Sequence, residues 1–260
     1  MTTKELTLAP NVDARLDDLA QRHNKASSGG MEIITRLGTH AEGWLDRLPA
    51  PVRDGLDGAT RAALSRAVKV AQASRTAVPD QPGWVNSVVG AAMGAAGGLG
   101  GAPTALAELP VTTTLLLRVI QGVAAEHGFD PAEENVQFDC LTVFGSAGPM
   151  ANDDGSDTAF LSARIGLSGA ALNKIIHAVA PKLAAAMGQK LAAQSVPLLG
   201  AAAGAAINYS FTSYYREMAY VHFGLRQLAI EADVPEAVLT RALQHKIAGV
   251  PVNLAARPPV

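Results

Sequence analysis

Four polar side chains at helical spacing are the residues of this sequence best arranged to do chemistry. Asn208, Tyr215 and His222 follow one another at intervals of seven residues, and Arg226 comes four residues after His222. Side chains at these intervals lie near one face of an α-helix, so the four form a polar stripe. The Arg226 guanidinium could bind an anionic headgroup through paired hydrogen bonds. The alternative, which we favour, is a structural network whose members satisfy one another.

Glu108 is the second candidate because it is the only charged residue between positions 84 and 117. A carboxylate in such an apolar stretch must be paired with a cation or hold its proton more tightly than usual. An ion pair is the simpler hypothesis and a catalytic acid the alternative. Pro110 follows closely and would either kink a helix, freeing a backbone carbonyl, or mark a helix start. The cations that could pair with Glu108 are Arg118, Lys182, Lys190 and Arg226.

No other motif indicates a reaction. The histidines at positions 23, 40, 127, 177, 222 and 245 lack metal-ligand spacing, and the sequence has neither H-E-x-x-H nor a phosphate-binding P-loop. The acidic segment 152–157 lacks the ligand spacing and the distal Glu of an EF-hand, so we expect a loop that caps the next helix. Segment 166–169 lacks the order of a nucleophile elbow. We therefore predict no catalytic residue, no metal and no cofactor, and we favour a protein without enzymatic activity over an enzyme.

The elements that must position these residues are predicted to be helices throughout, because no segment alternates as a strand does. Three N-terminal segments carry apolar residues at helical spacing. Gly29-Gly30 and the prolines at 49 and 51 are expected to separate them, and residues 78–83 are expected to form a linker. The apolar positions are Leu16, Leu19 and Ala20 in the first, Met31, Ile34, Leu37 and Trp44 in the second, and Leu56, Ala63, Ala67, Val70 and Ala71 in the third.

Two helix starts and one helix end carry local signals. Residues 130–133 place Asp130 at an N-cap, Pro131 at the first helical position and Glu133 three residues after the cap. Residues 233–236 have the same D-x-x-E form. Gly128 is expected to end the preceding helix in the left-handed conformation.

Residues 88–107 and 193–212 are uncharged stretches long enough to span a bilayer. They are dominated by Gly and Ala, however, whereas spanning depends on Leu, Ile, Phe and Val. We therefore predict buried small-residue helices. Segments 88–96 and 198–206 resemble each other, each with a G-x-x-x-G ridge, which indicates an internal repeat. The repeat would set Glu108 near Ser213, opposite the polar stripe. The expected fold is an all-α, single-domain helical bundle with this pseudo-repeat.

Composition excludes several classes of protein. Hydrophobic residues make up 48% and charged residues 17%, the balance of a folded globule. The net charge is −2 and no basic run occurs, so we expect no nucleic-acid partner. Cys140 is the only cysteine, which fits a reducing compartment. Residues 1–10 lack a basic segment followed by an apolar one, so no secretory signal is predicted and the expected location is cytoplasmic.

The central sequence resembles the EcsC family. The similar segments are GAAMGAAGGLGGAPTALAELP from Gly90, LLLRVIQGVAAEHGFD after it, KLAAQSVP from Lys190, GAAAGAAINYSF, and AYVHFGLRQL from Ala219. Glu108 stands where the family pattern suggests Asp. The resemblance implies an EcsC-like helical core over 81–250, with helices of residues 1–80 packed on it and a flexible tail at 251–260. It also implies a bacterial protein of a family named after an ABC-transporter operon, with no catalytic activity to transfer.

Three functions compete on these grounds. The first is a non-enzymatic accessory at the cytoplasmic face of the membrane, peripheral to it, with a lipid or membrane-protein partner. The second is a hydrolase or a small-molecule or lipid-binding protein with a central polar site around Glu108 and His222. The third is a homo-oligomer joined through its glycine ridges. The first is our leading hypothesis.

Overall fold

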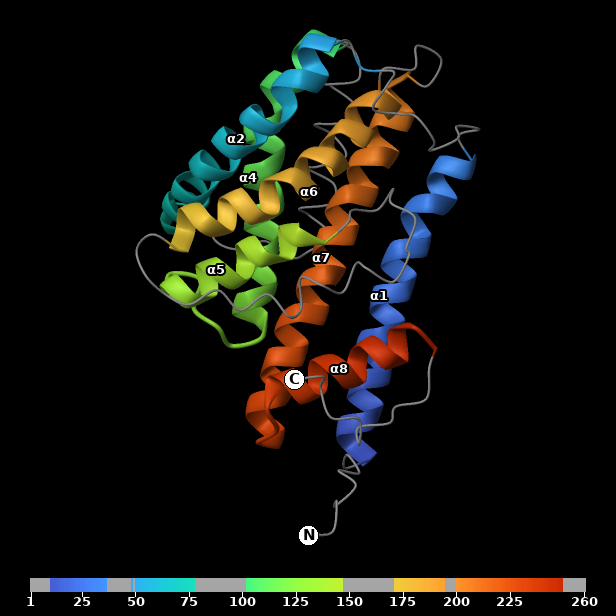
Figure 1. Cartoon of the computed structure of the whole chain (residues 1–260), viewed down its shortest axis with the longest axis vertical. Helices are drawn as coiled ribbons and strands as arrows, with labels where there is room; N and C mark the ends of the chain where they lie inside the picture. The colour runs from blue at the N-terminus through green and yellow to red at the C-terminus, as the bar shows by residue number, and fades with distance from the viewer. Residues whose placement is uncertain are drawn as a thin grey trace, which may run out of the picture.

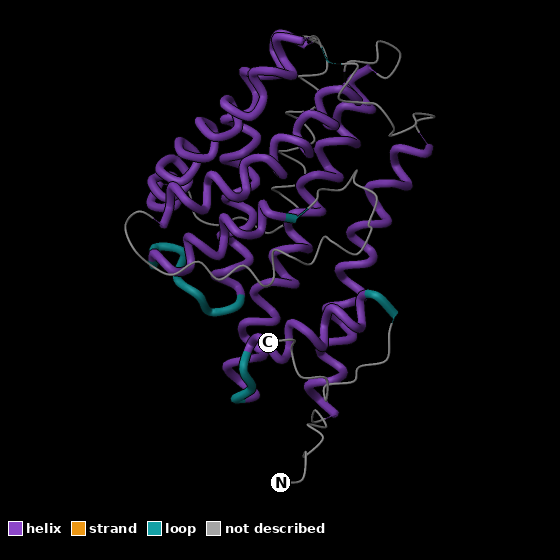
Figure 2. Tube along the Cα trace, in the orientation of Figure 1, coloured by secondary structure: helices purple, strands orange, loops and turns teal. Residues whose placement is uncertain are grey.

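The computed structural model describes residues 10–36, 48, 50–77, 102–146, 171–194 and 200–249. Within these ranges the chain is helical and contains no strand, which confirms the all-α prediction (Figure 2). The first repeat copy (88–96), the acidic segment 152–157 and the tail 251–260 lie outside these ranges. The helices are α1 (Pro10–Arg36), α2 (Ala50–Ala77), α4 (Ala102–Glu126), α5 (Glu134–Thr142), the short 3-10 helix η2 (Val143–Gly145), α6 (Ala171–Gln194), α7 (Gly200–Ala232) and α8 (Glu236–Ile247).

Helix α7 is the longest described helix and the centre of the fold. It packs against α1 on one side and α4 on the other, while α8 lies across the ends of α1 and α7 (Figure 1). Helix α2 packs on α4 and α6, on the flank away from α1. The polar stripe of α7 therefore runs through the middle of the bundle, where its surroundings come from several helices.

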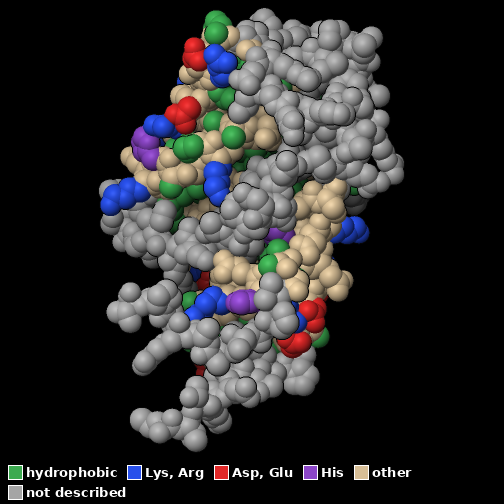
Figure 3. All heavy atoms as spheres, turned by 45° about the vertical axis from the view of Figure 1, so that its right-hand side comes forward, with side chains coloured by type: hydrophobic (Ala, Val, Ile, Leu, Met, Phe, Trp, Pro, Cys, Tyr) green, Lys and Arg blue, Asp and Glu red, His purple; other side chains and the backbone are tan. Residues whose placement is uncertain are grey.

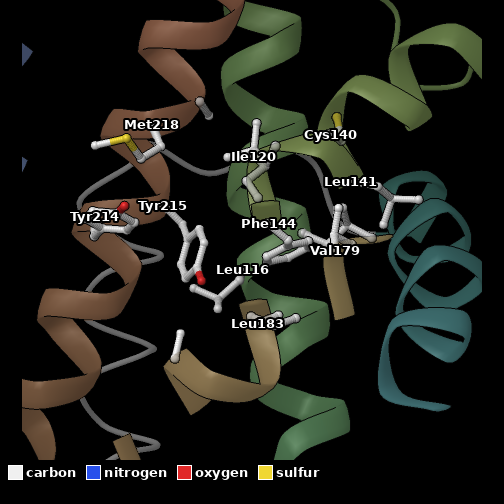
Figure 4. Packing of buried hydrophobic residues seen from close by; sticks show 14 of the residues in the cluster. Leu116, Ile120, Cys140, Leu141, Phe144, Val179, Leu183, Tyr214, Tyr215 and Met218 are labelled. Carbon is white, nitrogen blue, oxygen red and sulfur yellow. The ribbon is translucent and has the colours of Figure 1, made fainter. Parts of the chain in front are cut away.

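Aromatic and aliphatic side chains fill the space between α7, α4, α6 and η2 (Figure 4). Tyr215 is completely buried, and its ring centroid lies 5.3 Å from that of Phe144 in an edge-to-face arrangement. Leu116 of α4 and Leu183 of α6 belong to the same buried cluster. Burying one such large side chain contributes about 1.5–3 kcal/mol to stability, so this cluster holds the central helices together.

A lysine clamp attaches α8 to the first half of α1. Lys246 Nζ lies 3.0 Å from Asp13 Oδ1 and 2.5 Å from Asp17 Oδ1. Burial lowers the pKa of Lys246, but the hydrogen bonds and charges of Asp17 and Asp13 more than offset this, so that its pKa is raised. The clamp fixes the C-terminal helix against a helix more than 200 residues earlier in the chain.

Gly224 allows α1 and α7 to approach closely. A Cβ at Gly224 would lie 2.9 Å from Leu19 Cδ2 of α1, which is closer than carbon atoms normally pack. Gly224 lies outside both predicted glycine ridges. At Gly122 of α4, by contrast, no described atom lies within 4 Å of such a Cβ. The two glycines therefore differ in whether a side chain fits.

We expect Gly122→Ala to stabilise the protein by about 0.5–1 kcal/mol, because alanine has the higher helix propensity and meets open space. Gly224→Ala has the same propensity gain but must displace Leu19, so its net effect should be lower by about 1 kcal/mol or more. Urea unfolding of both variants measures the difference. Equal stabilisation by the two substitutions would contradict the close approach of α1 and α7.

Two details of the N-terminal prediction are wrong. Helix α1 continues through Gly29 and Gly30, which were expected to separate two helices. Glycine lowers helix propensity by about 1 kcal/mol but keeps its N–H, so the hydrogen-bond ladder can continue through it. Val70, expected on the apolar face of α2, is 52% exposed, whereas Leu56, Ala63 and Ala67 are buried as predicted.

The two D-x-x-E segments do not start helices where the sequence suggested. Helix α5 begins at Glu134, and Asp130 instead forms a turn in which its Oδ1 accepts a hydrogen bond from Ala132 N at 2.9 Å. Asp233 ends α7 in a left-handed conformation (φ 53°), and α8 begins at Glu236. An Asp side chain also favours turns and left-handed geometry, which compete with N-capping. Gly128 adopts the predicted left-handed conformation (φ 81°).

Pro110 lies inside α4, so it does not mark the start of that helix. A proline has no N–H, so the carbonyl four residues earlier loses its usual partner. The carbonyl of Pro110 itself accepts a hydrogen bond from Thr114 Oγ1 at 2.7 Å. Helix α6 has a proline in its interior as well, at Pro181.

Candidate functional site

The polar stripe of α7 lies inward for most of its length. Asn208 and His222 are 5% and 6% exposed, and Tyr215 is fully buried. Arg226, at the end of the stripe, is partly exposed. The heptad spacing alone places these residues on one helix face. The described contacts bring the last two of them, His222 and Arg226, together with Asp139 of α5.

The first centre gathers around Asp139 of α5. Arg226 donates a hydrogen bond to Asp139 Oδ2, forming an ion pair between α7 and α5. His222 Nε2 lies 3.7 Å from Asp139 Oδ1, which is beyond hydrogen-bond length but close enough for attraction when the ring is protonated. The Arg226 guanidinium carbon also lies 4.5 Å from the centroid of the Phe129 ring. A carboxylate on one side and an aromatic face on the other therefore hold this cation.

The local sequence explains why Asp139 sits at this place. Helix α5 is short, and its residues Val136, Phe138, Cys140 and Leu141 are buried, so the helix is enclosed by its neighbours. Asp139 is partly exposed on the side that meets α7. A carboxylate beside an apolar helix requires a counter-charge, which Arg226 provides.

The trio of Asp139, His222 and Arg226 could in principle orient a histidine base. In a catalytic pair, however, the carboxylate orients the imidazole and the imidazole reaches the substrate. Here the carboxylate is bound by Arg226, and His222 is almost fully enclosed. The arrangement is better suited to fixing α5 and the 129–133 turn against α7.

The second centre lies around Lys190 of α6. This side chain is 1% exposed, and its Nζ donates to Thr112 Oγ1 of α4 over a long distance of 3.4 Å. An ammonium group is rarely buried without further polar contacts. Lys190 Nζ and Thr112 Oγ1 therefore mark a polar centre within the small-residue part of the bundle.

Glu108 does not share a site with His222 and Arg226. Helices α4 and α7 run in the same direction (Figure 1), and Glu126 at the end of α4 accepts a hydrogen bond from Tyr220 late in α7. Glu108 precedes Glu126 by 18 residues, roughly 27 Å along the helix. The backbone of α4 therefore places Glu108 far from Arg226 and His222, and the described contacts do not bring these residues into one site.

The other proposed partners of Glu108 differ in position. The side chain of Glu108 lies outside the described residues, although its backbone belongs to α4. Arg118 follows it by ten residues on the same helix, roughly 15 Å away, and Lys182 is exposed on α6. Lys190 remains the best-placed cation, because its amino group meets Thr112, one helical turn after Glu108.

A third polar group links α1, α4 and α7 near the Glu126 end. Tyr220 donates its hydroxyl hydrogen to Glu126, and Arg22 of α1 lies over the Tyr220 ring at 5.1 Å from the centroid. Arg22 also donates to Glu217 at 3.0 Å. Burial, together with the hydrogen bond and charge of Glu126, raises the pKa of Tyr220 to about 12.

The Tyr220 hydroxyl should therefore lose its proton about two pH units above a free tyrosine, whose pKa is about 10. Because the pKa of Tyr220 is higher in the folded protein than in the unfolded chain, the protonated hydroxyl makes its full contribution to folding stability below pH 10. That contribution is lost between about pH 10 and 12. Glu126→Gln should lower the pKa of Tyr220 because it removes the charge that opposes ionisation. NMR titration of ¹³C-labelled tyrosine rings, assigned with Tyr220→Phe, measures the shift. An unchanged pKa in Glu126→Gln would contradict the contact.

Sequence reasoning missed Asp139 and Phe129. The signal for Asp139 was available, since it is the only charged residue between Glu134 and Asp153. The rule that selected Glu108 would have selected it as well. Phe129 carried no such signal, because its role depends on the left-handed turn at Gly128.

No group of three or more His, Cys, Asp or Glu residues in the described part of the chain could hold a metal ion. No helix in the described ranges combines the length and the apolarity needed to cross a bilayer.

The fold and its polar centres together define a class of protein: an all-α bundle whose inward polar groups tie its helices together. Within that class, the model of the EcsC protein family matches residues 85–228. This match covers more than half of the chain, so the protein belongs to the EcsC family. Comparisons with curated proteins and with solved structures found no match.

Proposed function

We propose that this EcsC family protein is a non-catalytic helical accessory that works at the inner face of the membrane through lipid or protein contacts. The proposal rests on a contrast between charged groups that have a counter-charge close by and charged groups that have none among the described residues. Inside the bundle, Asp139 is bound by Arg226 and lies near His222. On the surface, Arg66 and Lys69 of α2 and Lys174 and Lys182 of α6 make no hydrogen bond or ion pair with any residue that the structure describes. Uncompensated surface charge favours contact with another surface, whereas enzymes need reactive groups that open into a cavity.

Family membership supports the same proposal in a general way. The family takes its name from an operon that encodes an ABC transporter, so such a transporter is the protein partner to test first. Nothing in the described geometry favours the hydrolase alternative, because Glu108 and His222 lie far apart along α4 and α7. Self-association through the glycine ridges falls largely outside the described side chains.

Membrane fractionation tests this proposal with the full chain. The protein should sediment with isolated bacterial inner membranes and with vesicles of their extracted lipids, and high salt or alkaline carbonate should release it. Release by these treatments distinguishes a peripheral protein from an inserted one. Protein that stays in the supernatant with both preparations would overturn the proposal.

A further inference from the structure

Four exposed cations form a basic flank on two neighbouring helices: Arg66 and Lys69 of α2, and Lys174 and Lys182 of α6. None of the four has a hydrogen bond or an ion pair among the described residues. Helices α2 and α6 lie side by side and run in opposite directions (Figure 1). Arg61 of α2 and His177 of α6 are in contact, with Nη1 and Nδ1 3.0 Å apart, so the two helices meet at this point.

Within α2 and α6, as far as the structure describes them, the charge of this flank is not balanced. The acids of α2 are Asp54 and Asp57, and each lies beside an arginine: Asp54 Oδ1 is 3.6 Å from Arg53 Nε, and Asp57 Oδ2 is 2.6 Å from Arg61 Nη2. Helix α6 contains no Asp or Glu. The four cations of the basic flank therefore remain as an excess of positive charge in a chain whose net charge is −2. In Figure 3, Lys and Arg side chains are spread along this side of the molecule, with Asp, Glu and His side chains between them.

The shape and chemistry of the flank favour a lipid surface over a nucleic acid. Single-stranded nucleic acids are bound by aromatic side chains that stack on the bases, and neither α2 nor α6 contains Phe, Tyr or Trp. Val70, next to Lys69, is instead a half-exposed apolar side chain. Cations with an adjacent apolar group match the headgroup region of an anionic bilayer, where phosphates lie above acyl chains.

We infer that the basic flank is the membrane-binding face of this protein and that its partner is the surface of an anionic lipid bilayer. This inference rests on the proposed function and specifies which face makes the contact. Lys174 and Lys182 are eight residues apart, roughly 12 Å along α6, so several lipid headgroups are bound at once. Binding is electrostatic, and salt weakens it because the screening length falls from about 10 Å at 0.1 M to about 3 Å at 1 M.

Vesicle sedimentation of the full chain tests the inference with two compositions, phosphatidylcholine alone and an equal mixture with phosphatidylglycerol. Wild-type protein should bind only the mixed vesicles. Lys174→Gln/Lys182→Gln should weaken binding roughly thirtyfold, because each cation near the surface contributes roughly fivefold. The matched control is Lys25→Gln/Arg241→Gln, which removes the same charge from exposed positions on α1 and α8 and should bind like wild type.

The outcomes separate this inference from the proposed function. Equal binding of the flank variant and the control variant to anionic vesicles would overturn the basic flank as the binding face, while the membrane role would remain. Binding to native inner membranes without binding to lipid vesicles would overturn the lipid partner and indicate a membrane protein. Failure to bind either would overturn the proposed function as well.

Discussion

Replacing Asp139 with alanine should destabilise the folded protein by about 2–3 kcal/mol. Asp139 is the carboxylate between Arg226 and His222, and its loss leaves the Arg226 guanidinium partly buried without its counter-charge. Breaking a fully buried ion pair from one side costs about 3–5 kcal/mol. The expected value is lower here because 28% of the Asp139 side chain and 21% of the Arg226 side chain are exposed, so water compensates in part. Urea unfolding followed by circular dichroism measures the loss.

A double-mutant cycle separates the ion pair from the packing. Asp139→Ala and Arg226→Met should each destabilise the protein, and the double variant should cost less than their sum by about 1–2 kcal/mol. Asp139→Asn keeps the shape and removes the charge, so it isolates the electrostatic part. Additive effects of Asp139→Ala and Arg226→Met would contradict the contact between α5 and α7.

The same variants also distinguish a structural network from a ligand site. If the trio is structural, Asp139→Ala lowers stability but leaves vesicle binding intact at temperatures where the variant is folded. If Arg226 binds an anionic headgroup, Arg226→Met weakens binding of anionic vesicles even where the fold is unchanged. The position of Arg226 between Asp139 and the ring of Phe129 leads us to expect the structural result.

Helical periodicity predicted the class of fold well, because an amphipathic pattern reports directly on which face of a helix is buried. Leu16 of α1 and Ala63 of α2 are buried as that pattern required. Helix boundaries were harder to predict. Asp130 and Asp233 could each cap a helix or form a turn. Both lie in turns, which follow Gly128 and the end of α7 at Ala232.

For the polar candidates, too, the sequence predicts positions along one helix but not the contacts between helices. The stripe from Asn208 to Arg226 follows from spacing along one helix, so the sequence could predict it. The partners of the stripe could not be predicted, because they depend on which helix packs on which. Asp139 is 87 residues from Arg226, and only the packing of α5 beside α7 brings them together. The predicted partner, Glu108, lies early in α4, whereas the end of α4 is the part that meets the later half of α7, where Arg226 lies.

The free energy of unfolding of the protein should depend strongly on the Glu108 carboxylate, because the Lys190 ammonium is buried against the same part of α4. The Lys190 ammonium is 1% exposed and lies 3.4 Å from Thr112 Oγ1, which follows Glu108 by one helical turn on α4. A neutral hydroxyl is a poor counterpart for a buried cation, so a carboxylate should lie nearby. We therefore expect Glu108→Gln to destabilise the protein by about 3 kcal/mol, as measured by urea unfolding.

The double variant Glu108→Gln/Lys190→Met gives the sharper result. Removing both charges removes the cost of burying them, so this variant should be more stable than either single variant and close to wild type. The matched control is Lys182→Met, eight residues earlier on the same helix but exposed, which should change stability by no more than about 0.5 kcal/mol and show no coupling to Glu108→Gln. Additive losses in Glu108→Gln/Lys190→Met would mean that other groups compensate Lys190. Coupling would instead show that Glu108 of α4 and Lys190 of α6 form an ion pair inside the bundle.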